Sequence, residues 1–199
     1  MKYVFLFLMV LVLATSCSTR ERTELGDGYE LLTNNHDSLL HQQGYQELWY
    51  LSGGQNKLVW PRVTGDVIVT NGLALFTGAR SETRSISNYP SLFCYVGTDP
   101  VAEITDEVTR LWCLKNKLDP GNYYGSYVYL WPKLEKGNFM LSGHAREQRG
   151  NTNDWFQITL TTNELKNLVK ATQTKGTDAQ YQGVRFRIAV PEPKSGNTP

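Results

Sequence analysis

Residues 66–77 read DVIVTNGLALFT, two β-prone runs joined by Asn71 and Gly72. Asn-Gly between such runs is the strongest short-range hairpin signal, because both turn residues tolerate a positive φ. A second pair of runs, QELWYLS at 46–52 and KLVW at 57–60, flanks a glycine-containing segment of the kind that joins hairpin strands. Together these residues predict an antiparallel meander.

The rest of the chain adds short strand-like runs and two amphipathic helices. Further strands are expected at 29–33, 91–96, 123–131, 138–142, 154–159 and 183–190. One helix is expected at about 99–115, where Asp99 would cap it and Pro100 would take its first position. The other is expected at about 161–175, where Thr161 and Glu164 form a capping-box pattern. The sequence therefore predicts an α+β fold, a mostly antiparallel sheet with both helices packed on it.

The composition is that of an ordinary globular protein. Of 199 residues, 40% are hydrophobic and 20% are charged, which argues against global disorder. The 20 basic and 19 acidic residues nearly balance, whereas nucleic-acid binders usually carry a basic excess. We therefore expect no nucleic-acid partner.

The first 17 residues read MKYVFLFLMVLVLATSC. A basic residue, an apolar run too short to span a bilayer, and small residues before a cut are typical of a secretory signal. The last five, Leu13 to Cys17, resemble the lipobox of bacterial lipoproteins, in which small residues stand just before a cysteine. Ordinary secretion with a cut after Ser16 is the alternative, because Ala14 and Ser16 also suit a general signal peptidase.

The resemblance implies that Cys17 is acylated, that the chain is cut before it, and that it becomes the lipidated N-terminus. Stable membrane attachment needs more than one acyl chain, and the three chains typical of this family would meet that need. Ser18 in place of Asp favours the outer membrane over the inner one, by the sorting rule of enteric bacteria. Loss of the signal also removes Lys2, so the mature chain has equal numbers of acidic and basic residues.

These features predict one folded domain on a lipid anchor. We expect a signal peptide at 1–16, a lipidated cysteine and tether at 17–28, a single α+β domain at 29–190 and a flexible tail at 191–199. The polar stretch at 79–90 is either a loop or a boundary between two subdomains.

Two cysteines remain, Cys94 and Cys113. An exported protein meets an oxidising compartment, where a disulfide is stable. A helix that folds back on its strand would bring the two cysteines level, but Cys113 points away from the apolar stripe of that helix. The sequence leaves two alternatives, a disulfide between them or two unpaired, partly buried thiols.

No catalytic, metal or cofactor motif rises above background. His36 and His41 stand five residues apart in a polar stretch, which is not a specific metal-site spacing. Glu103 and Glu107 are expected one turn apart on a solvated helix face. We therefore expect no metal and no cofactor, and we favour a non-enzymatic protein over a hydrolase that would use His144 with a carboxylate.

The most unusual segment is the aromatic run at 123–131. In a strand, Tyr123, Tyr127, Tyr129 and Trp131 would share one face. That face would be an exposed platform for a ligand, or it would pack in the core under a helix.

The sequence thus predicts a membrane-anchored lipoprotein of the bacterial envelope that acts as a non-enzymatic interaction or accessory module. Its expected contacts are the membrane, through the lipid, and an envelope protein or a glycan. The alternatives are a glycan- or peptidoglycan-binding protein that uses the aromatic strand face, and the hydrolase.

Overall fold

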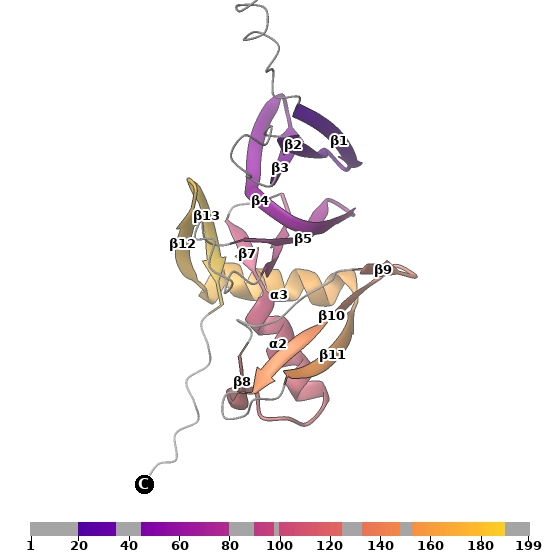
Figure 1. Ribbon diagram of the computed structural model, residues 1–199, viewed down its shortest axis with the longest axis vertical. Coiled ribbons are helices and arrows are strands. Elements are labelled where there is room, and N and C mark those ends of the chain that lie inside the picture. The colour runs from indigo at the N-terminus through magenta and orange to yellow at the C-terminus, as the bar shows by residue number, and fades with distance from the viewer. Residues whose placement is uncertain are drawn as a thin grey trace, which may run out of the picture.

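The computed structural model describes residues 20–34, 45–79, 90–97, 100–124, 133–147 and 153–189. In these ranges the chain is mostly β-strand and carries two α-helices, so the predicted combination of a large sheet and two helices is confirmed (Figure 1).

Nine strands form the large sheet, in the order β1-β2-β3-β4-β5-β6-β7-β13-β12. They are β1 (Arg20–Gly26), β2 (Tyr29–Asn34), β3 (Tyr45–Ser52), β4 (Gln55–Thr70), β5 (Leu73–Gly78), β6 (Ser91–Tyr95), β7 (Val101–Glu103), β12 (Thr177–Tyr181) and β13 (Val184–Ile188). The first seven follow the chain order as an antiparallel meander. β13 then returns from the far end of the chain and pairs parallel with β7.

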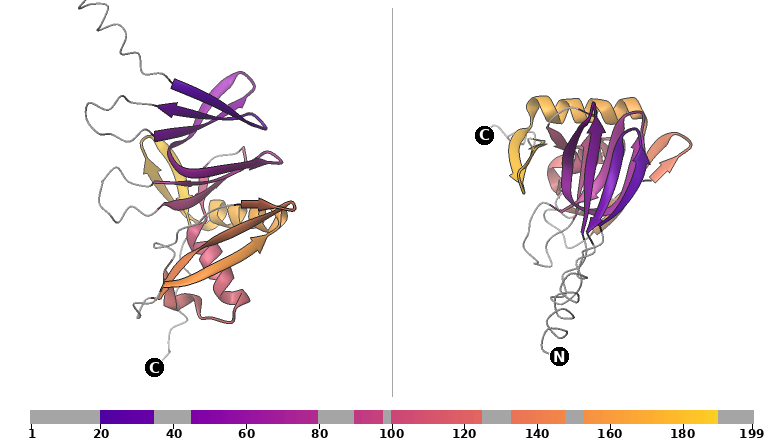
Figure 2. Two further views of the ribbon diagram at one scale, coloured as in Figure 1. Left: turned by 45° about the vertical axis from the view of Figure 1, so that its right-hand side comes forward. Right: turned by 90° about the horizontal axis from the view of Figure 1, so that it is seen from above.

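The long strand β4 folds the sheet into two layers. Its first half pairs with β3 and its second half pairs with β5, and Val63 is the residue that pairs on both sides. The β4–β5 register shifts between Val63 and Val67, which is where a strand can turn a corner between two sheet layers. The first layer therefore holds β1–β3 and the start of β4, and the second layer holds the rest of the sheet (Figure 2).

Trp60 shows how closely the layers meet. Its ring centroid lies 5.2 Å from that of Phe186 on β13 and 5.8 Å from that of Tyr181 on β12. In a flat sheet, β4 and β13 would lie about 19 Å apart, since three strands separate them. The sheet must therefore close over an interior, which we call the sandwich core. Its buried members are Tyr29, Leu48, Val59, Trp60, Val63, Ala74, Phe76, Phe93, Tyr95, Val101, Tyr181 and Phe186.

The central strands of the second layer are buried on both faces. In β5, Ala74 and Phe76 belong to the sandwich core, whereas Leu73 and Leu75 belong to a second cluster that we call the helix core. The alternation follows from the two-residue repeat of a strand. Because both faces are covered, every residue of β5 and β6 is buried.

The helix core lies between the second layer, the two helices and a small sheet. The helices are α2 (Thr105–Lys115) and α3 (Thr162–Lys175), and the short 3₁₀ turn η1 (Pro120–Asn122) follows α2. The small sheet contains β8 (Tyr123–Tyr124), β9 (Lys133–Glu135), β10 (Asn138–Glu147) and β11 (Asn153–Leu160). Figure 1 shows β10 and β11 at the end of the molecule opposite β1 and β2.

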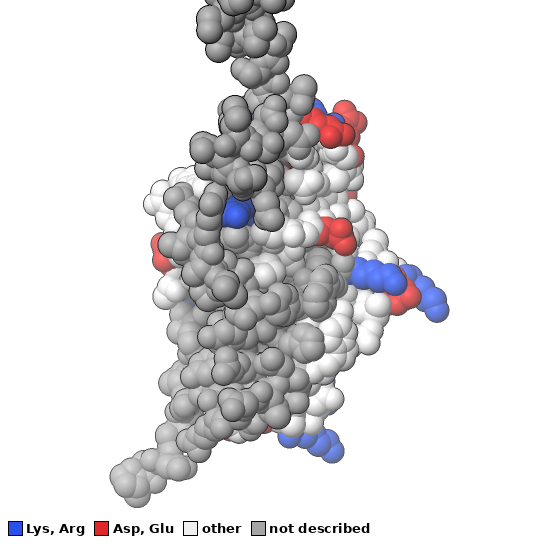
Figure 3. All heavy atoms as spheres, in the orientation of Figure 1, with Lys and Arg blue, Asp and Glu red and all other residues white. Residues whose placement is uncertain are grey.

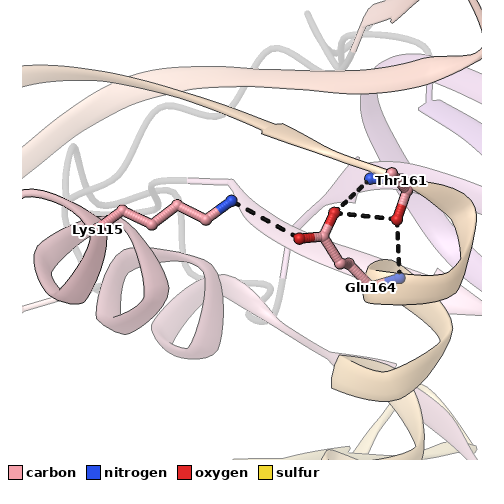
Figure 4. A network of polar contacts seen from close by, with 3 residues as sticks. All are labelled: Lys115, Thr161 and Glu164. Carbon is pink, nitrogen blue, oxygen red and sulfur yellow. Dashed lines mark hydrogen bonds and ion pairs between the residues drawn. The ribbon is translucent and has the colours of Figure 1, made fainter.

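The predicted capping box at the start of α3 is confirmed (Figure 4). The Thr161 backbone N–H donates to Glu164 Oε2 over 2.8 Å, and the Glu164 N–H donates to Thr161 Oγ1 over 3.2 Å. Lys115 at the end of α2 reaches the other carboxylate oxygen of Glu164 at 3.8 Å. The cap therefore ties the two helices together at their surface.

The first helix does not begin at Asp99, so that prediction was wrong. Residues 101–103 form β7, which pairs antiparallel with β6 and parallel with β13. Hydrogen bonds to two neighbouring strands outweigh the local helix-start signal. The helix begins at Thr105, after an Ile104 N-cap that makes no side-chain capping bond, and Asp99 lies outside the described residues.

The expected tether is also partly a strand. Residues 20–26 form β1, which pairs with β2 along its whole length apart from one irregularity near Gly26. Their alternating charges, which resemble a solvated linker, suit an edge strand because charge discourages further pairing. The strands that flank the suggested boundary at 79–90, β5 and β6, are paired in one sheet.

Candidate functional site

The solvent-facing side of the small sheet is built by the alternation of β10 and β11. On β11, Phe156, Ile158 and Leu160 point into the helix core and are buried. The residues between them, which are Trp155, Gln157 and Thr159, are exposed. One side of the sheet is therefore covered by the helix core, and the described residues of the other side that lie on β11 are exposed.

Trp155 is the most exposed large apolar side chain in the described part of the chain, at 55%. An indole offers a large, flat, rigid surface with one N–H donor, and such surfaces are commonly used for binding. Trp155 stands opposite His144 on β10, whose side chain lies outside the described set.

Hydrogen-bonding side chains continue the same face. Gln157 stands opposite Ser142, and Thr159 stands opposite Met140. The Gln157 amide donates to the Met140 sulfur, which is a weak acceptor and holds the amide across the two strands. We call Trp155, Gln157, Thr159, Met140 and Ser142 the Trp155 face.

The β9 hairpin borders the Trp155 face. Lys133 pairs with Met140, and Lys133, Glu135 and Lys136 are all exposed. Basic side chains project at this edge of the molecule with acidic atoms among them, and the end that carries β1 also shows both charges (Figure 3). The border of the Trp155 face is thus charged, and its centre carries the indole of Trp155 and the amide of Gln157.

The aromatic run predicted from sequence is only partly described. Tyr123 is half-buried, and its ring meets that of Trp112 edge-on with the centroids 5.5 Å apart. It therefore packs against the helix core, in line with the packing alternative. Tyr127, Tyr129 and Trp131 lie outside the described residues.

Cys94 and Cys113 are free, buried thiols in the structure. Cys94 lies on β6 and Cys113 on α2, and both belong to the helix core. Burial raises the pKa of the Cys94 thiol well above its usual value, and it raises the pKa of Cys113 to about 11. Both thiols are therefore protonated and poor nucleophiles at neutral pH.

The remaining candidates from sequence do not form a described cluster. Cys17, His36 and His41 lie outside the described residues. Glu103 is buried on β7, while Glu107 lies on α2 and accepts a 3.0 Å bond from Arg110, so the two do not share a helix face as expected. Over the described ranges, no group of three or more His, Cys, Asp and Glu side chains is placed to hold a metal ion.

A second polar group lies at the end of the sandwich core away from the bend in β4. The rings of Tyr29, Tyr50 and Tyr95 lie 4.7 to 6.3 Å apart, and Lys57 Nζ donates to the Tyr95 hydroxyl over 3.2 Å. Tyr29 and Tyr95 are only 1% and 2% exposed. This group therefore joins the two layers and offers little surface to a ligand.

No protein-family model, curated protein or solved structure matches this chain. None of the described helices is both long and apolar enough to cross a membrane.

Proposed function

We propose that the protein is a non-enzymatic binding domain of the bacterial envelope, anchored by a lipid on Cys17, and that it binds a glycan at the Trp155 face. The observation that carries the binding proposal is the exposed indole of Trp155 on a sheet face whose opposite side is fully packed. The anchor rests on the lipobox resemblance of residues 13–17.

The chemistry of the face suits a neutral sugar polymer. The apolar C–H face of a sugar ring can stack on an indole, and amide and hydroxyl groups beside it can bond the sugar hydroxyls. Gln157 and Ser142 supply such groups in the row next to Trp155. Because the mature chain has equal numbers of acidic and basic residues, long-range charge adds little to this selection.

Binding to isolated peptidoglycan tests the glycan. Trp155→Ala should weaken cosedimentation with peptidoglycan about tenfold, which corresponds to about 1.4 kcal/mol. Leu114→Ala is the matched control, because Leu114 is a similarly exposed apolar side chain on α2, at 51%. It should leave binding unchanged, and both variants should keep the wild-type circular dichroism spectrum.

Other outcomes point to the alternative functions. If Trp155→Ala binds peptidoglycan like the wild type but loses a protein crosslink in intact cells, the ligand is an envelope protein. If the bound polymer is cleaved and His144→Ala abolishes the cleavage, the protein is a hydrolase. The first result overturns the glycan-binding proposal, and the second overturns its non-enzymatic part.

The anchor has its own test. Cys17→Ser should move the protein from the membrane fraction to the soluble envelope fraction, because the acceptor for the lipid is gone. A variant that stays in the membrane fraction would show that the lipobox interpretation is wrong.

A further inference from the structure

The link between the proposed lipid on Cys17 and the first strand of the fold is very short. β1 begins at Arg20, so only Ser18 and Thr19 separate it from Cys17. A fully extended chain advances at most about 3.6 Å per residue, so Arg20 lies within about 11 Å of Cys17. A tether reaching to residue 28 would have allowed about 40 Å by the same measure.

The outer face of the first layer carries apolar side chains that belong to neither core. They are Leu32, Trp49, Leu51 and Leu58, all half-buried. Trp49 pairs with Leu58 across β3 and β4, and it pairs with Glu30 across β2 and β3. We call these four residues the first-layer face.

Two of the carboxylates beside this face are held by protein donors, and a third, Glu24 opposite Glu30, is exposed. Glu47 Oε2 accepts a 3.0 Å bond from the Trp49 indole N–H, and Glu30 pairs with Arg22 at 3.2 Å. Satisfied carboxylates cost less to bring near a bilayer than isolated ones. Tryptophan is enriched at the membrane–water boundary, where its ring is apolar and its N–H can still be bonded.

We propose that the first-layer face rests on the surface of the bilayer, an orientation that rests on the proposed lipid anchor at Cys17. The short link between Cys17 and Arg20 keeps the first layer close to the bilayer. The three leucines and Trp49 of the first-layer face then contact the bilayer surface. Because Arg20 and Arg22 alternate with Glu21 and Glu24 along this edge, the contact does not require anionic lipid.

This orientation places the Trp155 face away from the membrane. The small sheet lies beyond the second layer and the helices, at the opposite end of the long axis from β1 (Figure 1). Three layer-to-layer steps of about 10 Å put it about 30 Å further from the bilayer than the first layer. The bound glycan is therefore a polymer held apart from the membrane, not the sugar headgroup of a lipid in the same leaflet.

Two labelled variants of the full lipidated protein test the orientation. A bimane probe is attached at Glu24→Cys on β1 or at Gln157→Cys on β11, both exposed positions. The native Cys94 and Cys113 are buried and should not label. The proteins are reconstituted in phosphatidylcholine vesicles that contain headgroup-nitroxide lipid. We expect at least threefold stronger quenching at position 24 than at position 157.

Equal quenching at the two positions, or stronger quenching at position 157, would overturn the orientation. Vesicle flotation distinguishes failure of the anchor from failure of the orientation, because a protein without lipid would not float with the vesicles. Cys17→Ser, labelled at position 24, supplies that reference and should lose both flotation and quenching.

Discussion

The hydroxyl of Tyr29 donates a 3.1 Å hydrogen bond to the carbonyl oxygen of Gly72, across a chain separation of 43 residues. The Gly72 N–H in turn donates to Asp27 Oδ2 over 3.0 Å. Both polar groups of one turn glycine are therefore held by the β1–β2 turn of the other layer. This pair of bonds closes the sandwich at the end away from the bend in β4.

Removing the Tyr29 hydroxyl should loosen this closure. Tyr29→Phe keeps the ring but leaves the Gly72 carbonyl without its donor, which should lower the free energy of unfolding by about 1 kcal/mol in urea titrations. Tyr50→Phe, in the same group of rings, keeps the Tyr29–Gly72 bond and should cost less. Equal losses in the two variants would contradict the importance of the bond.

The same hydroxyl should limit stability in alkali. Burial, followed by the neighbouring Tyr50 and Tyr95, raises the pKa of Tyr29 well above its usual 10.0. The folded state keeps this proton above pH 10 while the unfolded state releases it, so stability is full below pH 10 and falls as pH rises beyond it. Chemical denaturation at pH 8 and pH 11 should show a smaller loss for Tyr29→Phe than for the wild type.

The helix cap offers a local test. Thr161→Ala removes the oxygen that accepts from the Glu164 N–H, and it should cost about 1 kcal/mol of unfolding free energy. Thr174→Ala, at an exposed site near the end of the same helix, should cost nothing measurable, because its hydroxyl only bonds back to the Lys170 carbonyl. A comparable loss in both variants would argue against the cap.

Gly78 should not tolerate a side chain. An added Cβ would press on the Trp60 indole nitrogen and would stand 3.1 Å from the Arg62 carbonyl oxygen. Because Trp60 is fully buried, it has no room to move away. Gly78→Ala should therefore lower stability by about 1 to 3 kcal/mol. Gly137→Ala cannot serve as a matched control, because Gly137 has a positive φ and a side chain there would add backbone strain. The stability of Gly78→Ala is therefore compared with that of the wild type.

The two buried thiols give a chemical readout. In Cys17→Ser protein, a thiol reagent such as DTNB should react with no cysteine in the native state and with both in guanidinium, because Cys94 and Cys113 are free and enclosed. If neither reacts in guanidinium until a reductant is added, the two cysteines form a disulfide in the protein as produced.

Local signals in the sequence were enough for several elements. Asn71 and Gly72 have φ values of 52° and 72° and join β4 to β5 as predicted, because their backbone preference acts within four residues. The Thr161 cap is equally local. β7 is mistaken for the start of a helix, because one of the two strands that hold it in the sheet, β13, lies about 80 residues further along the chain.

The candidate site was visible in part. Residues 154–159 were predicted to be a strand, and their alternation already separates Trp155 and Gln157 from Phe156 and Ile158. The sequence alone does not show where the helix core lies. That core decides which side of β11 is covered and which is exposed. The aromatic run at 123–131 holds more rings and therefore gives the stronger sequence signal for a binding face, although Tyr123 packs inward.

The parallel pairing of β13 with β7 sets an order of events for the growing chain. Phe186 must reach Val101 before the second layer is complete, so the sheet stays open until the C-terminal part of the chain has been made. Contacts of such long sequence separation form slowly, because a large loop must close first. An incomplete sheet with an open β7 edge is therefore a stage in the folding of this protein, and truncation before residue 184 would leave the sheet in that state.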